Sequence, residues 1–244
     1  MLIVFAGIIL PFIGTALGAA AVFILRKTNE SLEKAMGGFA SGVMVAASVW
    51  SLIIPGVEMS AGWGRLAFLP VVSGMAFSFL VMVLSERLIM KRQEGKTLQF
   101  FAVTVHNFPE GMAVGLMFAL WLKGASGAGL APCFAFSLAI ALQNIPEGAI
   151  ISMPCYSRGE KKSKAFLKGV VSGVVEPVGA LLTLAATGFA QKVLPCLFGF
   201  AAGAMLYAVC EVLSGKDEKH PFAVSLCFGA GFCLMMTMDV ALGQ

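Results

Sequence analysis

The chain has 244 residues, of which 59% are apolar and 12% are charged, and its net charge is +4. Soluble domains have about 45–50% apolar and about 25% charged residues, so this chain lacks the polar residues that would cover a water-soluble globule. Abundant Leu, Ile, Val and Phe with a small net charge also exclude a disordered chain. Because a spanning helix needs about 20 apolar residues, the length predicts roughly eight spans and no sizeable soluble domain.

Polar residues divide the chain into eight apolar segments, which we expect to be transmembrane helices of one all-α domain over residues 1–244. The first segment has no basic residue before its apolar run and is too long for a signal peptide, so we expect it to be retained. A β-barrel is disfavoured because the segments do not alternate apolar and polar residues. The expected spans are about 2–25, 35–56, 66–90, 99–122, 131–154, 166–189, 193–214 and 221–241.

Glycines recur four residues apart in several of these segments, as in Gly38–Gly42 and Gly111–Gly115. Small residues at this spacing let helix backbones approach closely in a membrane. The pattern therefore predicts close helix packing at these positions.

The basic residues are distributed unevenly between the connections. The even-numbered connections hold three of the 17 Lys and Arg residues, Arg65, Lys123 and Lys192, and the odd-numbered connections hold the other fourteen. Since cytoplasmic loops carry an excess of Lys and Arg, the odd-numbered connections are expected in the cytoplasm and both termini outside it. This topology explains the basic balance without a nucleic-acid partner.

Five acidic residues fall inside the apolar segments: Glu110, Glu147, Glu176, Glu211 and Asp239. An ionised carboxylate in the bilayer costs about 2.5–3.5 kcal/mol or more, so such residues usually serve a function or face a polar cavity. Few basic residues share these segments. We therefore expect a cation from outside to supply the opposite charge.

Two of the acids belong to a repeated motif. The fourth segment contains His106-Asn107-Phe108-Pro109-Glu110-Gly111, and the fifth contains Gln143-Asn144-Ile145-Pro146-Glu147-Gly148, starting 37 residues later. In each copy the first residue and the Glu are four apart and lie on one helical face. Each Pro removes a backbone donor, so we expect two broken helices that form an inverted central pair, as in transport sites near the midplane.

The side chains of the two copies suit a divalent metal ion. One imidazole, two carboxylates and three amides are ligands for Zn²⁺, Fe²⁺ or Mn²⁺. An intramembrane metalloenzyme is the alternative from another class, but the chain has no HExxH, GxSxG or Walker motif. We therefore expect a metal transporter that is not an enzyme, with a metal-selective channel on the same fold as the second transport reading.

The chain resembles the ZIP family of divalent-metal transporters over all eight segments, nearest to its bacterial and GufA-like members. Besides the two motifs, the resemblance rests on Gly42–Ser48, Val174–Pro177, Met205–Tyr207 with Glu211, and Met235–Gly243. It implies a two-metal site in which Glu110 and Glu147 bridge the ions. One ion would bind Met44, His106, Glu110, Gln143 and Glu147, and the other would bind Asn107, Glu110, Asn144, Glu147 and Glu176.

The chain departs from the family at three positions: many members have His where Gln143 stands, some have Asp at Asn144, and relatives often have His at Cys210. Ser51, Glu211 and Asp239 are further candidates along the path. The family implies import of Zn²⁺, or of Fe²⁺, Mn²⁺ or Cd²⁺, across the plasma membrane by alternating access, without a prosthetic group. The sequence leaves open whether the chain forms a homodimer.

The topology predicts which loop positions an impermeant thiol reagent reaches. In a variant without the native cysteines, Lys123→Cys should react from outside the cell, because it lies in an even-numbered connection. Ser163→Cys lies in the fifth connection and should react only after the membrane is permeabilised. Reaction of Ser163→Cys in intact cells would reverse the assignment.

Overall fold

The computed structural model describes residues 1–24, 30–90, 96–124, 129–213 and 221–242. Some side chains within these helices, including those of His106 and Glu211, lie outside the description. The described residues form helices and short connections without a strand, which confirms the all-α prediction for this part. In chain order the elements are α1 (Leu2–Ala19), α2 (Ala21–Ile24), α3 (Glu30–Ala47), the π-helix η1 (Ser48–Ile53), α4 (Ile54–Met59), the 3₁₀-helix η2 (Ala61–Leu66), α5 (Leu69–Met90), α6 (Lys96–Leu122), α7 (Leu130–Ser157), α8 (Lys162–Gly173), α9 (Val175–Ala185), α10 (Thr187–Leu213) and α11 (Pro221–Leu242).

Six helical stretches of the described chain are long and apolar enough to cross a membrane. They are Leu2–Ile24, Lys34–Met59, Leu130–Ser157, Lys162–Ala185, Lys192–Cys210 and Phe222–Ala241. A shorter apolar helix occupies Leu69–Ser85 within α5. The total of eight spans therefore stays a prediction, since α5 and α6 are not among the six.

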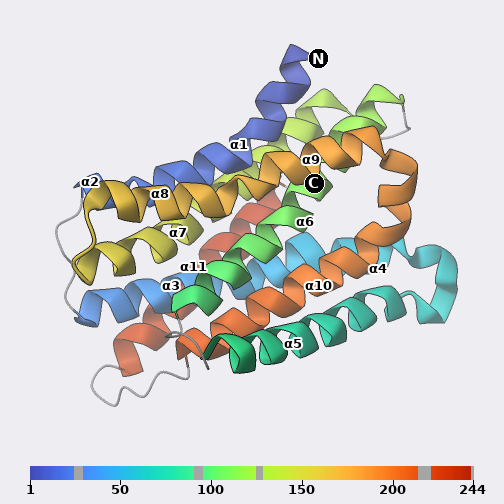
Figure 1. Ribbon diagram of the computed structural model, residues 1–244. Helices are drawn as coiled ribbons and strands as arrows, with labels where there is room; N and C mark the ends of the chain where they lie inside the picture. Colours follow the sequence, from blue (N-terminus) through green and yellow to red (C-terminus); the bar gives the residue numbers. More distant parts are fainter. Residues whose placement is uncertain (25–29, 91–95, 125–128, 214–220, 243–244) are drawn as a thin grey trace.

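The helices gather in two groups (Figure 1). In one group α1 packs on α7 and α8, and α6 packs on α9; in the other, α3 packs on α11 and α5 packs on α10. The contact between α6 and α10 is the most extensive one joining the two groups. In Figure 1 α1, α8 and α9 of the first group lie above α3, α10 and α5 of the second, and α6 of the first group runs between them.

Glycines allow the backbones of the most extensive helix pairs to approach. A Cβ added at Gly111 in α6 would lie 2.0 Å from the carbonyl oxygen of Glu176 in α9. A Cβ at Gly42 in α3 would lie 2.0 Å from that of Phe228 in α11. The close packing predicted for Gly38–Gly42 and Gly111–Gly115 is confirmed. The same kind of contact joins α1 to α7 and α5 to α10 through Gly14, Gly18, Gly148, Gly74 and Gly199.

A π-helical turn interrupts the rod formed by α3 and α4. In an α-helix the N–H of residue 55 would donate to the carbonyl of Ser51. Pro55 has no N–H, so this hydrogen bond cannot form. The preceding N–H, that of Ile54, instead donates to the carbonyl of Val49 five residues back. Such turns often occur at functional sites, and this one separates Met44 from the end of the rod.

The helix breaks differ from those predicted. Both α6 and α7 continue through Pro109 and Pro146, so the expectation of two broken helices there is wrong in the described structure. The lost bond at each proline is absorbed within an otherwise continuous helix. The break lies instead at Val174 between α8 and α9, where Pro177 cannot donate to the carbonyl of Gly173. The inverted arrangement of α6 and α7 stays a prediction.

Two glycines of α11 provide a matched test of the close contacts. Gly231→Ala should lower the melting temperature of the purified protein, because the added Cβ would lie 2.1 Å from the carbonyl oxygen of Phe39. Overpacking of this kind costs about 1–3 kcal/mol. Gly229→Ala has no heavy atom within 4 Å of the added Cβ and should leave the melting temperature unchanged or raise it. Equal melting temperatures for both variants would contradict the packing.

Candidate metal site

Six of the predicted site residues are buried in the interior. Asn107 and Glu110 lie on α6, Glu176 lies on α9, and the other three lie on α7; each is at most 1% exposed. The three on α7 are Gln143, Asn144 and Glu147. None of the described Lys and Arg residues is buried, and the hydrogen bonds that Glu110 and Glu176 accept from described side chains come from amides and a hydroxyl.

A hydrogen bond between the two motif copies links α6 and α7. The side-chain nitrogen Nε2 of Gln143 donates to Oε1 of Glu110 at 2.7 Å. This bond fixes which end of the Gln143 amide faces the carboxylate. Its oxygen Oε1 is buried and has no hydrogen-bond partner among the described residues. The amide therefore presents an oxygen that is available to a cation.

Asn107 plays the corresponding part between α6 and α9. Its nitrogen Nδ2 donates to Oε1 of Glu176 at 3.0 Å and to the carbonyl of Ser172 at 3.2 Å. Its oxygen Oδ1 is buried, and the described part of the chain offers it no donor. Oδ1 of Asn144 is likewise buried without a hydrogen bond to any described group. Three amide oxygens of the predicted site thus receive no hydrogen bond from the part of the chain that the structure describes.

Glu176 lies in the first turn of α9, just after the break at Val174. A helix N-terminus carries partial positive charge that stabilises a carboxylate. Its Oε1 accepts hydrogen bonds from Asn107 and from the hydroxyl of Thr15, which is 2.6 Å away on α1. Its Oε2 is buried without a partner among the described groups. Sequence reasoning missed Thr15, because a threonine in an apolar helix gives no distinct signal.

The remaining candidates either make other contacts in the structure or lie outside the description. Met44 on α3 is 2% exposed and belongs to an apolar cluster that includes Met112 and Ala113 of α6. Ser51 of η1 and Asp239 of α11 meet, with Ser51 Oγ donating to Asp239 Oδ1 at 2.8 Å. The side chains of the predicted ligand His106 and of the path candidate Glu211 lie outside the described residues.

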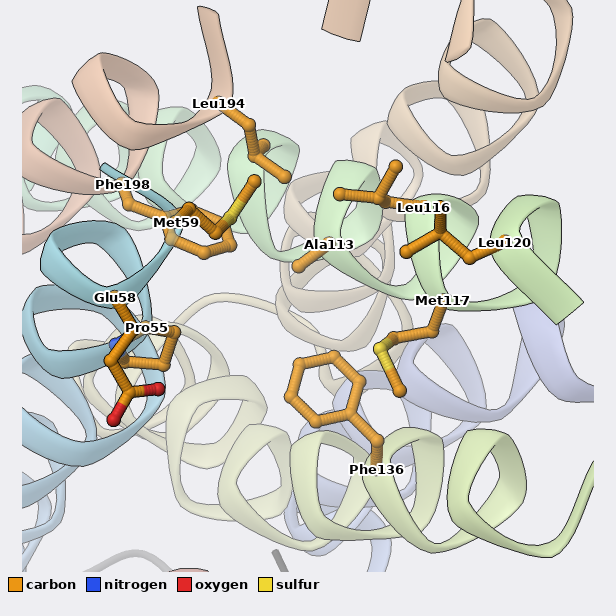
Figure 2. Close-up of a pocket in the computed structure, with 10 residues that line it drawn as sticks. All are labelled: Pro55, Glu58, Met59, Ala113, Leu116, Met117, Leu120, Phe136, Leu194 and Phe198. Atoms are coloured by element: carbon orange, nitrogen blue, oxygen red, sulfur yellow. The ribbon is translucent and has the colours of Figure 1, made fainter. Parts of the chain in front are cut away.

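A cavity of about 460 Å³ lies between α4, α6, α7 and α10. Its walls are apolar except for Glu58, which Figure 2 shows at the edge formed by α4. Ala113 in its wall is three residues from Glu110 on α6, so this end of the cavity lies about one helical turn from the carboxylate. The lining residues are Pro55, Glu58, Met59, Ala113, Leu116, Met117, Leu120, Phe136, Leu194 and Phe198.

The described residues contain no group of three or more His, Cys, Asp or Glu side chains arranged to hold a metal. Glu110, Glu147 and Glu176 are therefore not grouped as one set of metal ligands in this structure. The rest of the predicted ligand set is amide, thioether or His106, whose side chain lies outside the described residues. Any metal centre here would depend on Asn and Gln oxygens beside carboxylates. Oxygen ligands of this kind are harder than imidazole or thiolate.

Comparisons with known proteins give one consistent family. Residues 87–239 match the family model described as ZIP Zinc transporter. The chain is 35% identical to zinc transporter ZIPB of Bordetella bronchiseptica, covering 95% of this chain and 79% of that protein. It is 32% identical to zinc transporter GufA of Myxococcus xanthus, over 94% and 96%. It is 30% identical to human zinc transporter ZIP11, over 94% of each.

The bond from Asn107 to Glu176 predicts how an added charge changes stability. Asn107→Asp removes a donor and places a second carboxylate beside Glu176, so the metal-free protein should melt about 3–8 °C lower. Added Zn²⁺ should raise its melting temperature more than it raises that of the unmodified protein. Asn107→Ala, which adds no charge, should show no enhanced response to zinc. An unaltered melting temperature for Asn107→Asp in chelator would contradict the geometry.

Proposed function

The chain belongs to the ZIP family of zinc transporters, and on that basis we propose that it carries Zn²⁺ into the cytoplasm through the buried carboxylates and amides of α6, α7 and α9. Its apolar helices agree with a multi-pass membrane protein. Its relatives are named transporters, and nothing in them indicates catalysis. Zinc is therefore a transported substrate in this proposal.

The observation that carries the proposal is the orientation of the amides. Asn107 and Gln143 both turn their nitrogen toward a carboxylate, and each leaves a buried oxygen to which no described residue donates. An unsatisfied buried acceptor costs about 1–3 kcal/mol. A divalent cation could bind these amide oxygens and the carboxylate oxygens at the same time. A single hydrogen-bond donor would satisfy only one of them.

We assign the ligands to two neighbouring ions. One ion binds Met44, His106, Glu110, Gln143 and Glu147, and the other binds Asn107, Glu110, Asn144, Glu147 and Glu176. Glu110 and Glu147 bridge the two ions in this assignment. It is supported by the burial of all six described acid and amide ligands and by the helical spacing that places each Glu beside its amide neighbours.

Metal preference follows from the ligand types. Gln143 contributes a harder ligand than imidazole would, and Asn144 contributes no charge where an aspartate would add one. The site therefore has lower charge and softness than a His- and Asp-containing version. We propose Zn²⁺ as the main substrate, with Fe²⁺, Mn²⁺ and Cd²⁺ as competing ones.

We propose that the cavity bounded by Glu58 is the outward approach to the site. It lies toward the end of α6 that leads to the connection containing Lys123, which the basic-residue distribution assigns to the outside. Ser51, Asp239 and Glu211 are proposed as further residues along the path, and Ser51 donates a hydrogen bond to Asp239. The protein then resides in the plasma membrane with both termini outside the cytoplasm.

Alternating access is supported by the apolar layer that helices of the second group form with α6 of the first group. The cluster there includes five methionines, whose unbranched side chains can repack. The glycine contacts to backbone, by contrast, lie within the groups. We propose that the groups move relative to each other at this layer and expose the carboxylates to each side in turn. The five residues are Met44, Met82, Met112, Met205 and Met235.

The central test removes one charge from the carboxylate pair. Glu110→Gln and Glu147→Gln keep the shape of the side chain but remove a charge and a bidentate ligand. Each should abolish zinc uptake into proteoliposomes, a loss of at least about 100-fold. Asn144→Ala should reduce uptake only partly, because water can replace a neutral ligand. Uptake by the unmodified protein should saturate with zinc concentration, whereas a channel would give linear flux.

Glu160→Gln is the matched control for these substitutions. Glu160 is exposed enough to contact solvent and is paired with Lys168 at 2.5 Å, in the connection between α7 and α8. Glu160→Gln removes this ion pair and a carboxylate that lies outside the site, so zinc uptake should be unchanged. Near-normal zinc flux in Glu110→Gln or Glu147→Gln at matched protein content would overturn the proposed site.

A further inference from the structure

Helix α1 reaches the site through one hydroxyl. Thr15 is fully buried, and its Oγ1 lies 2.6 Å from Oε1 of Glu176 on α9. The alternative acceptor, the carbonyl of Pro11 on its own helix, is 3.4 Å away. A hydroxyl has one proton to donate, and 2.6 Å is in the range of strong bonds to a charged oxygen. The carboxylate is therefore its acceptor.

The backbone around Thr15 fixes where this hydroxyl lies. A Cβ added at Gly148, the residue after Glu147, would lie 2.0 Å from the carbonyl oxygen of Thr15. A Cβ added at Gly173 would lie 2.9 Å from Cβ of Thr15. Thr15 is thus one of the points at which both α7 and α8 approach α1 closely. The helices that carry Glu147 and lead into Glu176 are positioned against the same threonine.

The hydrogen bond from Thr15 determines which oxygen of Glu176 is engaged by protein donors and which is left for another ligand. Oε1 accepts from both Thr15 and Asn107, while Oε2 is buried with no donor among the described residues. Two donors on one oxygen hold the carboxylate plane in a single orientation. Asn107 donates one N–H to this oxygen and the other to the carbonyl of Ser172, so Thr15 supplies the second donor to Oε1.

We propose that Thr15 is a positioning residue of the transport site, which holds Glu176 so that Oε2 is presented to the transported cation. This inference rests on the proposed function, since it takes Glu176 as a ligand. It extends the site to α1, a helix with no ionisable side chain among its residues. The β-branched shape is also used, because the methyl carbon Cγ2 packs against Gly173 while Oγ1 bonds the carboxylate.

The test compares hydroxyl and methyl at one position. Thr15→Val keeps the branched shape but removes the donor, whereas Thr15→Ser keeps the donor. In proteoliposomes, Thr15→Val should raise the apparent KM for Zn²⁺ about tenfold, the loss expected for one hydrogen bond to a charged group. Its maximal rate should stay within about twofold of the original, and Thr15→Ser should restore KM to within about threefold.

Thr183→Val is the matched control. Thr183 is as buried as Thr15, but its hydroxyl donates to the carbonyl of Gly179 within α9, so its loss should not change KM. An unchanged KM in Thr15→Val, or equal impairment of Thr15→Val and Thr15→Ser, would overturn the positioning role. If Thr15→Val does not insert, Thr15→Ser against Thr15→Ala gives the same comparison of one hydroxyl.

Glu110→Gln, measured in parallel, separates this inference from the function on which it rests. If Glu110→Gln transports zinc normally, the proposed transport site itself fails. If Glu110→Gln is inactive while Thr15→Val keeps its KM, the site stands and only the role of Thr15 is overturned. If Glu110→Gln is inactive and Thr15→Val shows the raised KM, both are supported.

Discussion

The burial of three carboxylates among packed helices is the constraint on which the rest of the structure depends. Glu110, Glu147 and Glu176 are each at most 1% exposed, and a buried charge is costly unless polar groups surround it. The described polar groups around them are short amides and hydroxyls on neighbouring helices. Short side chains reach across only where helix axes lie close together, so the chemistry of the site sets how tightly these helices must pack.

Glycine is what makes that distance possible. Asn107 bonds Glu176 across the α6–α9 contact, where Gly111 faces the carbonyl of Glu176 itself. Thr15 bonds Glu176 where Gly148 and Gly173 let α1 approach. The same positions that hold the helices together therefore bring donors to the carboxylate. The close packing of the helices and the hydrogen bonds to Glu176 therefore depend on the same glycine contacts, so a change in one would change the other.

The sequence predicted the members of the buried polar cluster more completely than the backbone around them. Repeated spacing and acids in apolar segments led to Asn107, Glu110, Gln143, Asn144, Glu147 and Glu176, because burial of such groups is costly wherever the helices lie. Thr15 could not be found this way, since most helical threonines bond their own backbone, as Thr183 does. The breaks were misplaced for a related reason. Pro109, Pro146 and Pro177 look alike in sequence, but only Pro177 lies beside a break.

The glycine contacts also limit how this chain can change over evolution. Usually a larger side chain on one helix can be accommodated when the facing residue becomes smaller. Here the atom facing Gly111 or Gly42 is a main-chain carbonyl oxygen, which every amino acid carries. No substitution on the facing helix can remove it, so compensating pairs of mutations are not available at these contacts. The side chain of Phe228, which faces Gly42, is free to vary, whereas Glu176, which faces Gly111, is also a proposed ligand. Related sequences should therefore keep glycine at position 42 while position 228 varies.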